Sequence, residues 1–443
     1  MTRPFLADPS EQLAGIRSKL DEVWDRSDYY REKFRRHGVE PRDFETLADL
    51  AKFPFFDKEE ERQSQQESRE RLGHSFGLHL TCDPSDVIRV SASSGTTGSP
   101  TYTPFTRRDK AWACENAGRV FSRIGVQRGD RFAHASVLSM WIAGYPFAVA
   151  IEEYGACVVP IGVLTGVERF LAVARDLRPT TISATVSYVR HLGEKLRTQF
   201  DVDPSTLGVE RLIVYGEPGG SIPEVYSALE STFGAVVYDL TGATGAHSPT
   251  AISCSEHNGM HFLAPDSCFI ELVDPNTLEP LPIEDGVIGE VVYTGYQKEA
   301  SPLIRWRDKD LVKVETTQCG CGHPEPRLWI LGRTDDMIIV KGVNVYPSAI
   351  EDVLRSTSPA LTGNVRIVLD HPGPAVEPPV RLRVELAASH AVDDNRDLKD
   401  VLEQRMHADL RFRSDVQLLT REEFGDGFGA THKSKRIERT FEQ

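Results

Sequence analysis

The chain of 443 residues has no long hydrophobic run and an excess of acidic side chains. No stretch of about 18 apolar residues predicts a membrane-spanning helix, and residues 1–8 lack the apolar region of a secretory signal peptide. Asp and Glu outnumber Lys and Arg by 66 to 51, for a formal net charge of −15. This balance argues against nucleic acid or an anionic membrane as the main partner. We therefore expect a cytoplasmic protein whose partners are small molecules.

Cysteine is sparse, and its number does not predict disulfides. The chain has 7 cysteines, an odd number, and disulfides are uncommon in the cytoplasm. Buried or incidental thiols are the simplest interpretation of Cys82, Cys114, Cys157 and Cys268. The other cysteines lie in polar, turn-rich segments close to histidines, and they require a separate explanation.

Length and pattern together predict a two-part α/β protein. A chain of 443 residues exceeds what one core usually organises. Residues 80–250 alternate strand-like runs with amphipathic helical segments, which is typical of a sheet layered with helices, and residues 251–330 are richer in strand signals. The pattern changes after residue 332. We predict a large N-terminal layered α/β domain with a β-rich portion over 1–332, and a small C-terminal α+β domain over 333–443.

One short segment predicts a phosphate-binding loop. Six consecutive residues directly after a strand-like run are all either hydroxyl residues or glycines: Ser93, Ser94, Gly95, Thr96, Thr97 and Gly98. Glycine lets the backbone bend closely around a ligand, and hydroxyls with free N–H groups cradle phosphate oxygens. The Gly-Lys-Ser/Thr ending of a P-loop NTPase is missing. A flexible linker is the alternative for this segment taken alone.

Further blocks follow this loop in a fixed order. Gly216, Glu217 and Pro218 come directly after a strand. Residues 302–311 read Pro-Leu-Ile-Arg-Trp-Arg-Asp-Lys-Asp-Leu, residues 332–347 begin Gly-Arg-Thr-Asp-Asp, and a lysine-bearing tail covers 427–439. Together with the loop, these blocks resemble the adenylate-forming enzymes, in the branch of the phenylacetate-CoA ligases. The resemblance covers about residues 80–440, and the block at 332–347 is its most specific part.

The resemblance implies a reaction and residues that perform it. Enzymes of this family join a carboxylate to the α-phosphate of ATP, expel pyrophosphate, and rotate a small mobile domain so that coenzyme A attacks the acyl-adenylate. It implies that Asp310 accepts hydrogen bonds from the ribose hydroxyls, that Arg333 donates to ribose or phosphate, and that Asp335 is the hinge. We predict an ATP-dependent acyl- or aryl-CoA ligase that uses Mg²⁺ and CoA and releases AMP. A homodimer is expected from the resemblance alone.

The catalytic lysine of this family has two candidates. In the family, a lysine of the C-terminal tail meets the carboxylate and the α-phosphate during adenylation and stabilises developing charge. Lys433, followed by Arg436, matches the form of the phenylacetate-CoA ligases and is preferred. Lys435 matches the Thr-x-x-Gly-Lys form found elsewhere in the superfamily. The usual preceding glycine is missing in both registers, so a solvated basic tail is the alternative.

The block at 238–247 departs from the family where the family places its magnesium ligand. The resemblance assigns the nucleotide side of the site to the adenine-side loop Gly216, Glu217 and Pro218 and to Tyr238, Asp239, Thr241, Gly242 and Thr244. The family motif is Tyr-Gly-x-Ser/Thr-Glu, but this chain has Thr241 in place of the tyrosine and Gly245 in place of the glutamate. The lost carboxylate is a hard oxygen ligand that Mg²⁺ prefers, and the lost ring is a stacking surface for adenine.

Three interpretations of this departure stay open. Phosphate oxygens, water and Glu217 hold the Mg²⁺; or the ATP half-reaction is slow or altered; or Gly245 makes room for a larger or differently charged acid, with His247 as a new polar group. A Gly245→Glu variant is the direct test. The acid itself is expected to be aromatic from the resemblance. Trp141, Tyr145 and Phe147 fall where the family builds its acyl pocket, and they either line that pocket or are ordinary core residues.

Cysteines and histidines gather in two short segments, 254–261 and 319–323. Thiolates and imidazole in two short loops suit tetrahedral zinc, and the resemblance implies a structural zinc in such segments. Cys254, His261, Cys319 and Cys321 are the preferred ligands, with His257 as a substitute for His261. Reduced, unligated thiols are the alternative.

Two other functions are compatible with the sequence. One keeps adenylation but passes the activated group to an amine or a carrier protein, or activates nitrite to diazotise an arylamine. The other is a non-catalytic binding protein on the same fold. An assay with ATP and candidate acids, with and without CoA, separates these possibilities.

Overall fold

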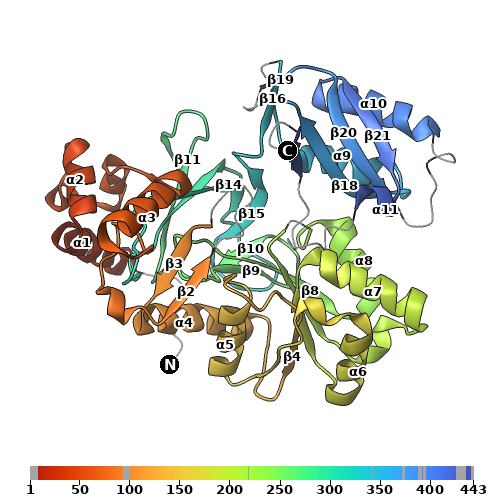
Figure 1. Ribbon diagram of the computed structural model, residues 1–443, viewed down its shortest axis with the longest axis horizontal. Helices are drawn as coiled ribbons and strands as arrows, with labels where there is room; N and C mark the ends of the chain where they lie inside the picture. The colour runs from red at the N-terminus through yellow and green to blue at the C-terminus, as the bar shows by residue number, and fades with distance from the viewer. Residues whose placement is uncertain are drawn as a thin grey trace. The chain divides into compact units, whose positions relative to one another are not determined.

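The computed structural model describes residues 8–92, 100–217, 219–341, 343–371, 375–387, 392, 396–425 and 436–440. The chain forms two compact units. The first comprises Met1–Asp308 and Val312–Trp329, and the second comprises Lys309–Leu311 and Ile330–Gln443. Both mix helices with sheets, as Figure 1 shows, so the predicted α/β class is confirmed. The predicted functional boundary at 332 and its hinge stay predictions.

The first unit is organised by a mixed sheet of the order β12-β11-β13-β14-β15-β10-β9-β8-β7-β6-β4-β5, with β1 paired to β14. Strands β5, β4, β6, β7 and β8 pair in parallel, and the direction reverses between β8 and β9. The strands are β1 Phe56–Asp57, β4 Arg131–His134, β5 Cys157–Val159, β6 Thr181–Ala184, β7 Arg211–Tyr215, β8 Val236–Thr241, β9 Ala251–Ser253, β10 Met260–Phe262, β11 Phe269–Val273, β12 Pro280–Leu281, β13 Ile288–Thr294, β14 Trp306–Glu315 and β15 Arg327–Arg333.

Helices connect and cover the parallel part of this sheet, as expected for parallel strands. Figure 1 shows α5 to α8 around β4 and β8. Because both faces are covered, β6 and β7 read as continuous buried runs rather than as alternating ones. The helices of this unit are α1 Pro9–Arg26, α2 Asp28–Arg36, α3 Lys58–Leu72, α4 Arg107–Arg123, α5 Tyr145–Tyr154, α6 Val167–Leu177, α7 Val186–Phe200 and α8 Pro223–Phe233, with short 3₁₀ turns at Pro41–Asp43, Leu47–Lys52, Pro84–Asp86, Val163–Thr165 and Pro204–Leu207.

Helix α3 is unusual because the face that it buries is polar. Its sequence is rich in Glu, Gln and Arg, and Asp57 caps it by accepting from the backbone N–H groups of Glu59 and Glu60. The buried side chains are Glu61, Ser64, Gln65 and Ser68. This face lies against a two-stranded hairpin, β2 Arg89–Ala92 and β3 Tyr102–Phe105, which brackets the predicted phosphate loop.

The second unit has its own core. A three-stranded sheet has the order β17-β16-β19, and a four-stranded sheet has the order β21-β20-β18-β22. Alternating residues of β18 and β20 point into a shared apolar cluster with α9 and α10, for example Ile367, Leu382 and Leu402. The elements are β16 Ile338–Val340, β17 Val343–Val345, α9 Pro347–Thr357, β18 Leu361–Leu369, β19 Ala375–Val376, β20 Val380–Leu386, α10 Arg396–Leu410, β21 Ser414–Leu419, α11 Arg421–Phe424 and β22 Ile437–Arg439.

Within the described ranges, no helix combines the length and the apolarity that crossing a membrane would require. The expectation of a cytoplasmic location stays a prediction.

Candidate functional site

The central parts of the predicted phosphate site lie outside the described residues. These are Ser93, Ser94, Gly95, Thr96, Thr97, Gly98, Pro218, and the candidate lysines Lys433 and Lys435. The positions on either side of the loop are described and well anchored. The backbone N–H of Ala92, at the end of β2, donates to the carbonyl of Met140 at 2.8 Å.

The other end of the loop is held by a side chain of α3. The amide of Gln65 donates to the carbonyl of Tyr102 at 2.6 Å and accepts from the N–H of the same residue at 2.9 Å. The Gln65 side chain thus satisfies both the backbone N–H and the carbonyl of Tyr102, the groups that a neighbouring strand would otherwise pair with. Helix α3 is thus fixed beside the exit of the phosphate loop, a link that the sequence did not reveal.

The segment 241–247, which departs from the family motif, begins at the end of β8, and a buried lysine donates a hydrogen bond to its backbone. Lys298 is 1% exposed, and its Nζ donates to the carbonyl of Thr244 at 2.9 Å. Burial lowers the pKa of Lys298, while the charges of Asp109 and Glu61 oppose that effect. Lys298 was missed in the sequence because an isolated lysine in a turn normally indicates an exposed side chain.

Gly245 is a glycine for a reason of packing. A Cβ atom built on it would lie 2.7 Å from the Cβ and Cδ1 atoms of Trp306, which is almost fully buried. The indole therefore occupies the space that a side chain at position 245 would need. A Gly245→Glu variant would disturb this contact as well as any magnesium site, so it is not a clean test of either.

The contact predicts that even alanine is harmful at this position. We expect Gly245→Ala to lower the free energy of unfolding by about 1–3 kcal/mol, because an added methyl group overpacks the site. Gly118 of α4 is a matched control, since a Cβ there makes an ordinary contact of 3.5 Å with Tyr154. Gly118→Ala should be neutral or stabilising. Urea unfolding measures the stability of both variants. A Gly245→Ala protein as stable as the wild type would contradict the conclusion that Trp306 fills the side-chain space at position 245.

His247 is completely buried and paired with Asp109. Its Nε2 lies 2.9 Å from Oδ1 of that carboxylate, and burial lowers the pKa of His247 although Asp109 opposes the shift. Asp109 also accepts from the backbone N–H groups of Glu299 and Ala300 at 2.8 and 3.0 Å. The pair therefore links the altered motif to the chain beside Lys298. A role for His247 toward the acid stays a prediction.

The other predicted nucleotide residues have partners within the fold. One oxygen of the Glu217 carboxylate accepts from the backbone N–H and the hydroxyl of Ser187, in the first turn of α7. This contact makes Glu217 a cap of that helix, and it would have to be broken before Glu217 could reach a metal through the same oxygen. Asp239 accepts from the hydroxyl of Ser221 at 2.7 Å, and burial raises the pKa of Asp239 to about 6.

Tyr238, Gly242 and Thr241 frame the end of β8. Tyr238 is buried in a core cluster with Tyr215. A Cβ on Gly242 would lie 2.5 Å from the Oγ of Ser248, so the packing at this position also leaves no space for a side chain. Thr241 closes the strand by accepting, through its carbonyl, the N–H of Thr250 at 3.0 Å.

The predicted ribose and hinge residues meet at one arginine of the second unit. Arg333 Nη1 lies 3.2 Å from Oδ1 of Asp310, and its Nε and Nη2 donate to the two oxygens of Asp335 at 2.9 and 3.0 Å. The guanidinium is thus shared by both carboxylates, and its fork geometry suits the bidentate pair. Their roles toward ribose and in hinge motion stay predictions.

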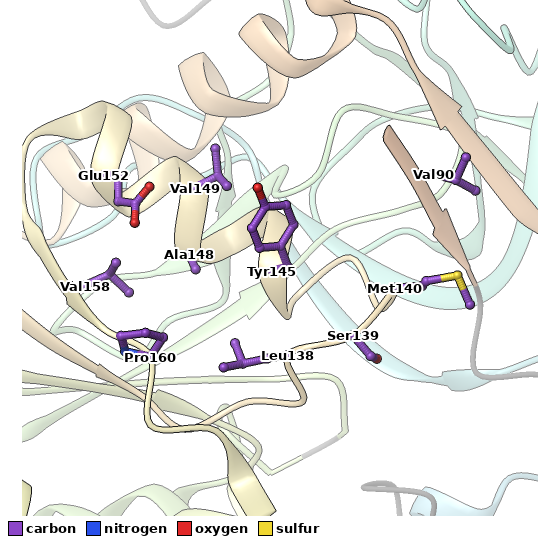
Figure 2. Close-up of a pocket in the computed structure, with 10 residues that line it drawn as sticks. All are labelled: Val90, Leu138, Ser139, Met140, Tyr145, Ala148, Val149, Glu152, Val158 and Pro160. Carbon is purple, nitrogen blue, oxygen red and sulfur yellow. The ribbon is translucent and has the colours of Figure 1, made fainter. Parts of the chain in front are cut away.

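The predicted acyl-pocket residues, Trp141 before α5 and Tyr145 and Phe147 within it, have different surroundings. Trp141 and Phe147 pack against Tyr215, with ring centroids 5.8 and 5.7 Å away. Tyr145 is 57% exposed and lines a cavity of about 520 Å³ (Figure 2). The walls of this cavity are mostly apolar, and in the view of Figure 2 Tyr145 lies between Glu152 on one side and Met140 and Val90 on the other. The assignment of Trp141 and Tyr145 to acid binding stays a prediction.

The predicted zinc ligands lie together. One ligand atom from each of Cys254, His261, Cys319 and Cys321 falls within 4.8 Å of all the others. The Sγ atoms of Cys254 and Cys319 are 3.7 Å apart, and Sγ of Cys321 is 3.4 Å from Nε2 of His261. Donors about 2.0–2.3 Å from a tetrahedral zinc lie about 3.3–3.8 Å from each other. The spacing therefore fits such an ion and is far too long for a disulfide.

The surroundings of this cluster support a metal. Nδ1 of His261 lies 3.4 Å from Glu325, whose other oxygen accepts from the buried guanidinium of Arg123 at 2.6 Å. A carboxylate behind a histidine is the usual arrangement around a metal-bound imidazole. Burial opposes ionisation of Cys319, but hydrogen bonds from Cys321, His261 and Cys254 lower its pKa to about 6.

His257 is not part of the cluster. Its Nε2 lies 3.0 Å from Glu230, and its ring stacks on Tyr226 with centroids 3.9 Å apart. Both alternatives offered an acceptable ligand spacing in the sequence, and the structure favours His261.

Two family descriptions match the chain. Residues 32–298 match "AMP-binding enzyme", and residues 342–438 match "AMP-binding enzyme C-terminal domain". A phenylacetate-coenzyme A ligase of Thermus thermophilus is 32% identical over 384 residues, which cover 85% of this chain and 82% of that protein. One of Pseudomonas putida is 32% identical over 345 residues, with 77% and 74% covered.

A solved structure extends the similarity to three dimensions. It is 2-hydroxyisobutyryl-CoA ligase in the postadenylation state, in complex with 2-HIB-AMP. The TM-score is 0.85 at 26% identity, with 98% of this chain and 90% of that chain covered.

Proposed function

The chain belongs to the AMP-binding enzymes, in the branch of the phenylacetate-CoA ligases, and from this membership we propose that it activates a carboxylic acid with ATP and transfers it to coenzyme A. The observation that carries the proposal is the extent of the match. Both the large domain and the C-terminal domain are present, and relatives at 32% identity are covered over most of their length.

The chemistry divides into two half-reactions. A carboxylate oxygen of the acid attacks the α-phosphorus of ATP, and the bond to the leaving pyrophosphate breaks. The thiol sulfur of CoA then attacks the acyl carbon, its proton is lost, and AMP leaves. Asp310 and Arg333 would hold the ribose and phosphate during the first step, and the loop at 93–98 would hold the departing phosphates. Mg²⁺, the cofactor that this chemistry implies, would neutralise charge on the phosphates of ATP.

The cysteine–histidine cluster would hold a structural zinc. Its closed set of four protein ligands leaves no position for a reacting water, so zinc there would join the two loops that carry the ligands rather than take part in catalysis. An aromatic acid as the substrate and a homodimer as the assembly are further expectations of the family.

Acid-dependent exchange of pyrophosphate into ATP tests the proposal. We expect exchange with a panel of aryl carboxylic acids in the absence of CoA, and a thioester once CoA is added. Pyrophosphate release without any thioester product would favour an amine, a carrier protein or another acceptor. Absence of exchange with every acid would favour a binding protein. The reported relatives are CoA ligases, so the thioester is the expected result.

A further inference from the structure

His257 connects one loop of the proposed zinc site to helix α8. This loop, here called the metal loop, comprises residues 254–259 between β9 and β10 and begins with Cys254. Nε2 of His257 lies 3.0 Å from Oε1 of Glu230, and the imidazole stacks on the ring of Tyr226 with the two planes 11° from parallel. Tyr226 and Glu230 are four residues apart on α8, so they lie on one face of the helix. The side chain of His257 is only 12% exposed, so the contact is shielded from solvent.

The start of α8 adjoins the predicted nucleotide site. The segment 219–222 separates the predicted adenine-side block at 216–218 from the first residue of α8. Ile222 is the N-cap of the helix, and its side chain has no polar group to bond the free N–H groups of the first turn. On the other side, a Cβ built on Gly220 would lie 2.5 Å from Cγ of Asp239 in β8. The segment is therefore closely packed, and a displacement of α8 would displace it as well.

A second contact joins the metal loop to the same segment. Oγ of Ser253, the residue before Cys254, accepts from the backbone N–H of Asp239 at 2.8 Å. The carboxylate of Asp239 accepts in turn from the hydroxyl of Ser221 at 2.7 Å. The metal loop thus reaches the segment 219–222 by two routes, one through α8 and one through β8.

We propose that His257 is a positioning residue for nucleotide binding, which holds α8 against the metal loop and thereby fixes the segment 219–222 beside the predicted adenine-side block. The proposal rests on the proposed function for the presence of a nucleotide. His257 lies outside the candidate four-ligand cluster, so this role does not require it to touch a metal. A binding site whose walls are fixed in advance loses less conformational freedom when the ligand binds. Loosening α8 should therefore weaken the binding of the nucleotide.

Binding of AMP to the full-length protein, measured by isothermal titration calorimetry, tests this role. We expect His257→Ala to raise the Kd for AMP about fivefold to tenfold, the usual order for the loss of a coupled contact, and to leave the zinc content unchanged. His257→Phe keeps an aromatic ring on Tyr226 and should bind AMP within about threefold of the wild type. Glu230 is left intact, because it also accepts from the N–H of Val237 in β8. His407→Ala, an exposed change on α10, is the control and should alter neither value.

Turnover adds a readout that general destabilisation would not produce. In His257→Ala, the KM for ATP should rise, while kcat and the KM for the acid should stay within about twofold of the wild type. Tyr226→Ala removes the other half of the stack, so the double variant should bind AMP no more weakly than the weaker single variant.

The alternative is that His257 only stabilises the fold. A His257→Ala protein with a lower melting temperature and unchanged AMP affinity would establish that role and overturn the proposal, and so would a loss of zinc in this variant. If His257→Ala does not fold, His257→Gln removes only the stacked ring, and AMP affinity equal to that of the wild type would then overturn the proposal. Absence of AMP binding by the wild type would instead contradict the proposed function itself, and this proposal with it.

Discussion

Replacement of Lys433 by alanine should slow acyl-adenylate formation by about 10²- to 10³-fold, the usual effect of losing one group that stabilises charge in the transition state. The lysine is expected to reach the carboxylate and the α-phosphate only while the adenylate forms. Thioester formation from a chemically prepared acyl-adenylate should therefore stay within about threefold of the wild-type rate. Single-turnover measurement of each half-reaction separates these effects.

The described end of this tail, residues 436–439, is fixed within the second unit. Arg436 pairs with Glu351 at 2.7 Å, and β22 pairs in parallel with β18. Lys435→Ala is the matched control, because it removes the same charge two positions along the chain and should slow adenylation less than tenfold. The reverse order of the two variants would show that the tail follows the register of the wider superfamily. Equal small effects would show that neither lysine is catalytic.

Loss of one of the four proposed zinc ligands should have the largest effect on stability. We expect Cys319→Ser to release the metal and to lower the melting temperature by about 10 °C or more, since loss of a structural metal belongs to the most destabilising changes in proteins. Protein purified without chelator should contain one zinc per chain, measured by mass spectrometry of the metal.

Cys157→Ser is the control for this experiment, because Cys157 is exposed and lies outside the cluster. It should change neither the zinc content nor the melting temperature. His257→Ala should also keep the metal, because His257 contacts Glu230 and Tyr226 instead. Wild-type protein without zinc would contradict the assignment, and loss of zinc in His257→Ala would show that the choice between the histidines is wrong.

The sequence was most informative where function is carried by local patterns. The order of the blocks at 93, 216, 302 and 332 was enough to identify the family, and the two-part α/β fold follows from the alternation of apolar periods. The cysteine and histidine segments also predicted a common cluster, because a tetrahedral site needs four suitable donors. His261 was the preferred ligand from the sequence, but His257 remained a substitute because both spacings are acceptable; the contacts of His257 with Glu230 and Tyr226 separate the two.

The structure was needed where distant residues share one space. Nothing near Gly245 in the sequence indicates that Trp306 fills its side-chain position. Glu61 lies in a run of charged residues, which normally indicates exposure to solvent, but its face of α3 is buried against β3. The change at 245 therefore looked like an isolated loss of a magnesium ligand. The packing that requires glycine at 245 depends on this tertiary contact with Trp306.

Oxygen transfer from the acid is the most direct test of the central claim, which is activation of a carboxylate as an adenylate followed by transfer to CoA. The enzyme is supplied with ATP, CoA and an aryl carboxylic acid that carries ¹⁸O in both carboxylate positions, and the products are analysed by mass spectrometry. The account predicts one ¹⁸O in AMP, one ¹⁸O in the acyl-CoA, and pyrophosphate without label. Unlabelled AMP, or ADP and phosphate in place of AMP and pyrophosphate, would contradict it.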